Sequence, residues 1–88
     1  MDPKLELARL ILKEALEEGE DLTFSELLEV LSERFKRALR GAERYLAELS
    51  SLGDLPPRVA IWRLMNDERW RTAFEEASKQ IVEEMLSA

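Results

Sequence analysis

Apolar residues recur every three or four positions along almost the whole chain, which is the spacing that lines them up on one face of an α-helix. Nothing in the sequence is typical of a β-strand. The 88 residues are enough for one hydrophobic core and too few for two. The pattern therefore predicts an all-α fold in a single domain that spans residues 1–88.

The first helix is expected to begin at Asp2, whose side chain can cap the first turn. Pro3 suits the first helical position because its missing N–H would have no partner there. Gly19 is expected to end this helix, since glycine readily adopts the left-handed backbone that closes many helices.

The second helix has the clearest start in the chain. Thr23 and Glu26 match a capping box, in which each side chain accepts a hydrogen bond from the other residue's amide. Leu22 and Leu27 match the hydrophobic staple that accompanies such a box. Two signals that agree within six residues predict a helix boundary at Thr23.

Gly41 leaves two interpretations open. The apolar seam keeps its phase across this glycine, which favours one long helix and four helices in total; its members are Leu27, Leu31, Phe35, Ala38, Ala42, Tyr45 and Leu49. Glycine inside a helix costs about 1 kcal/mol relative to alanine, however, and it suits a tight turn. We favour a kink or a short turn, with helices at 24–40 and 42–51.

The rest of the chain predicts a loop over 50–57 and two further helices. Gly53 and the paired prolines interrupt the chain before the segment 57–65, which is apolar on nearly every side and is therefore expected to be buried. Asn66-Asp67 can cap a last helix, whose core face would contain Trp70, Ala73, Phe74, Ala77, Ile81 and Met85. Five helices of unequal length favour a compact, irregular bundle with crossed helices.

The absence of histidine and cysteine removes the commonest metal ligands and nucleophiles. The serines have no histidine to activate them, and three scattered glycines form no phosphate-binding loop. The clustered glutamates, Glu14 among them, fall mainly off the apolar stripes and are expected to be solvated. We therefore expect neither enzymatic activity nor a cofactor or metal.

The charges are unevenly distributed, with a formal net charge of −6. Residues 34–71 hold nine basic and five acidic side chains, whereas residues 72–88 hold one basic and four acidic. The net acidity opposes binding to nucleic acid or to an anionic membrane. No apolar run is long enough for a membrane span, and the first residues do not form a signal peptide, so no compartment is indicated.

A few residues could form a surface for a partner. Tryptophan, tyrosine and arginine are typical anchors at interfaces, and the candidates are Arg37, Arg40, Arg44, Tyr45, Trp62 and Trp70. The three arginines are expected to lie on one helical face. Large aromatic residues at helical spacing more often belong to a core, and Trp62 and Trp70 could pack together across the turn at Asn66.

The sequence resembles de novo designed all-α proteins over its whole length. The resemblance is carried by Asp2-Pro3, by the Leu22/Thr23/Glu26/Leu27 capping box and staple, by glycines at helix ends, and by Leu/Ala stripes between Glu/Lys/Arg surfaces. It implies a stably folded protein whose purpose is its fold, with no biochemical activity and no partner. The alternative is a helical protein-interaction module or a designed binder. We expect a monomer, with a homodimer through the first helix as the other oligomeric state.

Overall fold

Five α-helices and one turn of 3₁₀ helix make up most of the residues that the computed structural model describes, 2–18 and 21–87. They are α1 (Pro3–Glu18), α2 (Phe24–Arg34), α3 (Glu43–Leu49), η1 (Ser50–Leu52), α4 (Pro57–Met65) and α5 (Glu68–Ser87). No strand occurs in this part of the chain. The prediction of an all-α fold with five helices is therefore confirmed.

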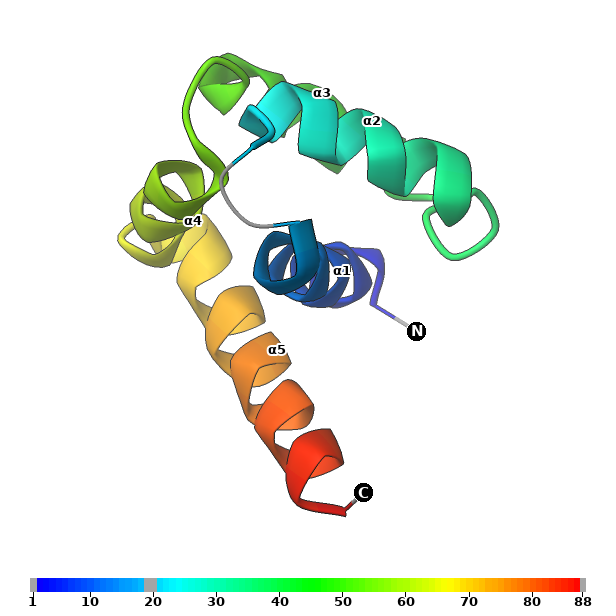
Figure 1. Ribbon diagram of the computed structural model, residues 1–88, viewed down its shortest axis with the longest axis vertical. Helices are drawn as coiled ribbons and strands as arrows, with labels where there is room; N and C mark the ends of the chain where they lie inside the picture. Colours follow the sequence, from blue (N-terminus) through cyan, green and yellow to red (C-terminus); the bar gives the residue numbers. More distant parts are fainter. Residues whose placement is uncertain (1, 19–20, 88) are drawn as a thin grey trace.

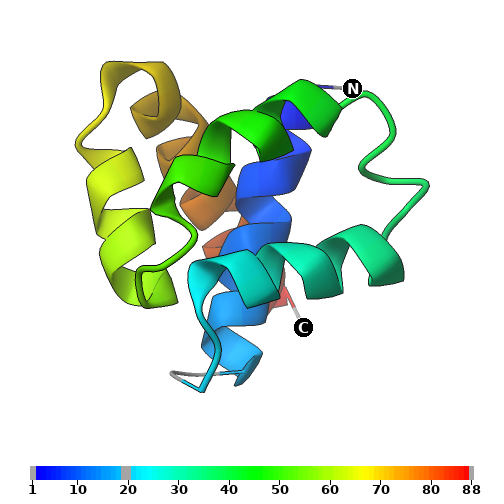
Figure 2. The same ribbon diagram turned by 90° about the horizontal axis from the view of Figure 1, so that it is seen from above.

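The helices cross one another around α1. Figure 1 shows α1 almost end-on between α2 and α5, which lie in the plane of the picture, and α4 packs beside the first half of α5. Figure 2 shows the same arrangement from above, with α3 crossing in front of α1, α4 to one side of it and α5 behind it. This geometry is an irregular bundle and not an up-and-down array.

One hydrophobic cluster joins all five helices, because each helix buries one stripe against its neighbours. The largest of its fully buried side chains are Leu7, Ile11, Phe24, Leu27, Leu31, Leu49, Trp70 and Phe74. The last helix contributes the predicted face from Trp70 to Ile81.

The predicted starts of the helices are confirmed in detail. Asp2 and Asp67 each accept a hydrogen bond at Oδ1 from the amide two residues later, at 3.0 and 2.9 Å. At α2 the amide of Glu26 donates to Thr23 Oγ1 over 3.2 Å, and the amide of Thr23 donates to Glu26 Oε1 over 2.9 Å. The expected end of the first helix at Gly19 lies outside the described residues.

The loop before α4 also covers the start of α2. The amide of Phe24 donates to the Leu55 carbonyl over 2.8 Å, and that of Ser25 donates to the Gly53 carbonyl over 3.0 Å. Gly53 is buried, and a Cβ placed on it would lie 3.0 Å from the Ser50 carbonyl oxygen and 3.1 Å from Ser25 Cβ. Glycine is needed here because two backbone segments approach closely.

Replacing Gly53 with alanine is therefore expected to destabilise the protein by about 1–2 kcal/mol, as overpacking of a tight contact does. Urea unfolding followed by circular dichroism measures this loss. Asp54→Ala changes the exposed neighbouring residue and should stay within about 0.5 kcal/mol of the wild type. Equal stability of all three proteins would show that the loop can move away from α2 at no cost.

The second helix ends six residues earlier than predicted, at Arg34 and not at Arg40. Phe35 leaves the helical region with φ −121° and ψ 44°, and residues 35–41 form turns. This ending buries Leu39, whereas Ala38, which we expected in the seam, is exposed. A leucine buries more apolar surface than an alanine, and this gain offsets the helical hydrogen bonds that are given up.

Gly41 therefore lies in a break between two helices. Its φ of +94° belongs to the left-handed region, where a side chain would be strained. The interpretation of a turn is confirmed, and that of one continuous helix is wrong.

The fourth helix is not buried on all sides as predicted. It buries only Pro57, Ala60 and Leu64, whereas Val59, Trp62 and Met65 are exposed. The helix packs against α5, α1 and α2 through one side, and no helix of the described residues covers the exposed apolar residues of its other side.

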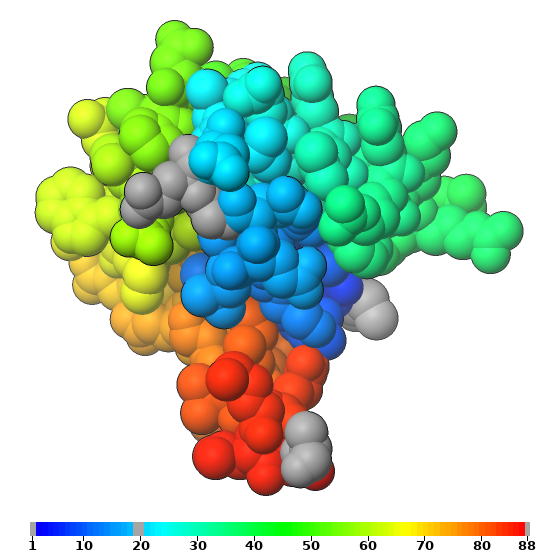
Figure 3. All heavy atoms as spheres, viewed as in Figure 1, coloured from blue at the N-terminus to red at the C-terminus, as the bar shows by residue number. Residues whose placement is uncertain are grey.

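The predicted core face of the last helix is also too long by one turn. Met85 is exposed together with Val82 and Leu86, because the end of α5 extends past the body of the protein. Figure 3 shows this end projecting below the other helices.

Candidate interaction surface on α4

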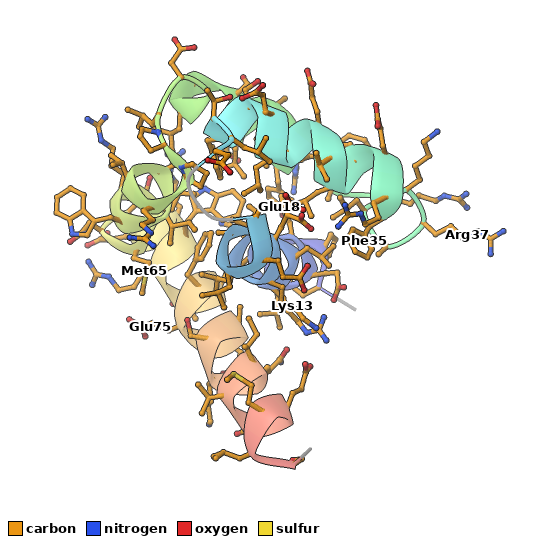
Figure 4. All side chains as sticks on the ribbon, in the orientation of Figure 1. Lys13, Glu18, Phe35, Arg37, Met65 and Glu75 are labelled. Carbon is orange, nitrogen blue, oxygen red and sulfur yellow. The ribbon has the colours of Figure 1, made fainter. Side chains whose placement is uncertain are left out.

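The structure separates the six candidate residues. Arg37 and Arg40 lie in the turn after α2, so they do not share a helical face with Arg44 on α3, and this expectation is wrong. Figure 4 shows Arg37 at the opposite edge of the molecule from Met65, which is the last residue of α4. The basic residues and Trp62 therefore do not form one surface.

Tyr45 and Trp70 belong to the packing of the bundle. Their rings meet edge to face with centroids 5.7 Å apart, and Trp70 also lies 6.2 Å from the ring of Phe74. The ammonium of Lys4 lies 4.6 Å from the Trp70 ring centroid and donates a hydrogen bond to the Arg69 carbonyl. Only 1% of Trp70 is exposed, so this tryptophan cannot anchor a partner.

Trp62 is placed differently, since 64% of it is exposed. The expected packing of Trp62 against Trp70 across the Asn66 turn is wrong. The buried residues of α4 lie on the side opposite to Trp62, because Ala60 and Leu64 are each two positions away from it, about 200° around a helix. The indole therefore points away from the core.

Trp62 lies between two other exposed apolar residues at intervals of three, which places all of them on one side of the helix. We call Val59, Trp62 and Met65 the α4 face. Two arginines and no acidic residue occur in α4. At the edge of the face, Arg71 of α5 donates through Nε to the Met65 carbonyl over 3.3 Å.

A cleft of about 220 Å³ lies next to α4, between η1 and the start of α5. Three of its four charged side chains pair with one another, because the Arg69 guanidinium bonds to both Glu48 and Asp67 at 3.1 Å. The hydrogen bonds from Arg69 hold the pKa of Asp67 below its usual value. Arg63 of α4 also lines the cleft and takes no part in these ion pairs, so the cleft carries one basic group next to α4.

A second cleft, of about 260 Å³, lies between α1 and the end of α2, where it is lined by Lys13, Arg34 and Phe35. Figure 4 shows Lys13 and Phe35 on these two elements. At its base is Glu14, which is only 3% exposed and accepts a hydrogen bond at Oε1 from Arg34 over 2.8 Å. The expectation that Glu14 is solvated is therefore wrong.

The environment of Glu14 favours its protonated form. Its other oxygen, Oε2, is buried and has no hydrogen-bond partner in the described part of the chain. Burial raises the pKa of Glu14, the Arg34 charge lowers it in part, and the neighbouring carboxylates of Glu17 and Glu18 raise it further. The sequence could have indicated the burial of Glu14. This residue follows Leu7 by seven positions and Ile11 by three, which places it on the buried side of α1.

The comparisons with known proteins identify no relative: no family model, no curated protein and no solved structure matches this chain. Among residues 2–18 and 21–87, no three acidic side chains are grouped so that they could hold a metal ion. In the same residues, none of the helices has the length and apolar character needed to cross a membrane.

Proposed function

We propose that this chain is a non-catalytic helical scaffold whose α4 face binds an amphipathic helix of a partner protein. The observation that carries this proposal is the exposure of Trp62 on an otherwise apolar face, while the other tryptophan is buried in the core. Tryptophan is the residue type most often found at the energetic centre of an interface. A flat row of apolar side chains on one helix suits the apolar face of another helix.

The charges around the α4 face favour an acidic partner. Arg63 follows Trp62 directly on the exposed part of the helix, and Arg71 bonds to the last turn of α4. No ion pair within the described residues involves either arginine. Acidic side chains on the partner would meet these charges at the rim, which raises the association rate and fixes the orientation.

The non-catalytic part of the proposal rests on composition and on the use of the charged residues. The chain has no histidine and no cysteine, and the buried Glu14 is held by Arg34. The confirmed caps at the starts of α1 and α2 support a designed origin, since these are the features that design rules prescribe. A designed binder and a designed scaffold share these features, and the α4 face favours the binder.

Nuclear magnetic resonance can test the α4 face with two synthetic peptides. One is an amphipathic helix with glutamates at its polar positions, and the other has lysines in their place. We expect the acidic peptide to shift the amide resonances of α4 and to bind more tightly than its basic twin. Trp62→Ala should weaken this binding about 30-fold, as truncation of a hot-spot tryptophan does.

Leu16→Ala provides the matched control, because it removes an exposed leucine from α1. This variant should bind the acidic peptide as the wild type does. Equal affinity for the two peptides, or binding that survives Trp62→Ala, would refute the proposal.

A further inference from the structure

The end of α5 exposes an apolar side that no other element of the described residues covers. Val82, Met85 and Leu86 are exposed, and their spacing of three and four positions places them on one side of the helix. Leu86 is 82% exposed, the largest value among these side chains. Apolar residues grouped in this way usually mark an interaction site.

This end of the molecule is acidic. From the middle of α5 to its end, residues 75–87 contain Glu75, Glu76, Glu83 and Glu84, and Lys79 is the one basic side chain among them. Glu84 is neutralised within the chain, since it pairs with Arg9 at 2.7 Å and Lys13 at 3.5 Å. Within the described residues, no ion pair involves the other three glutamates.

The end of α5 cannot reach the α4 face of its own chain. The helix has 20 residues, so it is about 30 Å long, and α4 packs beside its first half. Figure 1 shows the C-terminal end of α5 pointing away from α4. Any contact between these two surfaces must therefore join two molecules.

Both surfaces lie along one edge of the molecule. Figure 4 shows Met65 and Glu75 on the same side, and Val82 and Leu86 follow Glu75 by seven and eleven positions, which keeps them on that side of α5. The edge is apolar and basic at its α4 end and apolar and acidic at its α5 end. A two-fold rotation places the basic end of one copy against the acidic end of the other.

We propose that the partner of the α4 face is the end of α5 in a second copy of this chain, in a two-fold symmetric dimer. This proposal rests on the proposed function of the α4 face. Each dimer contains two identical contacts, in which Trp62 of one copy packs on Val82, Met85 and Leu86 of the other. Arg63 and Arg71 then face the glutamates of α5, so apolar burial and charge favour the same arrangement.

Sedimentation equilibrium tests the dimer with the full chain. The mass should rise from 10.2 kDa toward twice that value as the concentration increases, and high salt should weaken the association. Trp62→Glu and Leu86→Lys should each reduce the association constant at least 30-fold, because each breaks both contacts of the dimer. Circular dichroism should show that both variants remain folded, since both residues are exposed.

A mixture of the two variants provides the sharpest test. In a mixed pair, the unchanged α4 face of Leu86→Lys meets the unchanged α5 end of Trp62→Glu, so one contact is restored. We expect a heterodimer to form in the mixture although neither variant dimerises alone. Leu16→Glu on α1 is the control and should dimerise as the wild type does.

Three results would overturn the dimer: a wild-type chain that stays monomeric at every concentration, variants that dimerise unchanged, or a dimer lost only in Leu16→Glu. The last result would place the interface on α1. The peptide titration separates these failures from the proposed function. A monomer that still binds the acidic helix at α4 keeps the binding function and loses only the second copy as its partner.

Discussion

Replacing Phe74 with alanine is expected to lower the free energy of unfolding by about 3–5 kcal/mol, the largest loss from any substitution considered for this protein. Phe74 is fully buried in the middle of α5 and lies 6.2 Å from the Trp70 ring. Truncation removes its apolar surface from the core and leaves a cavity beside the tryptophan. A domain of this size has a total stability of about 4–13 kcal/mol, so this loss removes a large share of it.

Urea unfolding followed by circular dichroism measures this effect, with Phe35→Ala as the matched control. Phe35 is only half-buried at the end of α2, so the same truncation there should cost clearly less. The near-ultraviolet signal of Trp70 should also weaken in Phe74→Ala, because the indole loses a neighbour. An equal loss in both variants would show that the two phenylalanines contribute alike to the core.

The parts of the fold that the sequence predicts best are those decided by neighbouring residues. The capping box at Thr23 and the cap at Asp67 depend only on amides two or three positions away. Each signal can therefore be read without knowledge of the rest of the molecule. The break at Gly41 belongs to the same group, because its left-handed backbone depends on the absence of a side chain.

The parts that the sequence does not predict depend on contacts between distant segments. The end of α2 at Arg34 follows from the burial of Leu39, and no local stop signal marks it. The loop carbonyls that cover the start of α2 come from residues about thirty positions away in the chain, as with Leu55 and Phe24. Periodicity alone cannot place such contacts.

The candidate site was only partly predictable for the same reason. Trp62 and Trp70 are alike by residue type and helical context, yet one is exposed and the other is buried. The difference arises because α5 is packed against α1, whereas no other helix in residues 2–18 and 21–87 covers the outer side of α4. Apolar residues on all sides of a short helix therefore indicate either a central helix or an outer helix with a binding face.

Removing Arg34 is expected to have the second-largest effect, through the buried carboxylate that it holds. Arg34→Met leaves Glu14 with neither oxygen paired, and loss of one partner of a fully buried pair costs about 3–5 kcal/mol. Arg34 is half-exposed and Glu14 can take up a proton, so the loss should be smaller than for a fully buried pair. We expect Arg34→Met to lower the free energy of unfolding by about 2–3 kcal/mol at pH 8 and by less at pH 5.

The pH dependence identifies Glu14 as the origin of this effect. Because the pKa of Glu14 is raised in the folded chain, its contribution to stability is fully present below its ordinary pKa and is lost as the pH rises through the folded pKa. Glu84 and Asp67 have lowered pKa values and contribute in the opposite direction at acidic pH, so the informative quantity is the difference between variants.

Arg34→Met should therefore lose stability more steeply with rising pH than the wild type does, because the pKa of Glu14 rises further without the guanidinium. Glu14→Gln cannot ionise at this position, so it should remove the part of the pH dependence that comes from Glu14 and be more stable than the wild type at pH 8. Urea unfolding at several pH values between 4 and 8 measures all three proteins. Parallel curves for wild type and Glu14→Gln would show that Glu14 is ionised as readily in the folded chain as in the unfolded one.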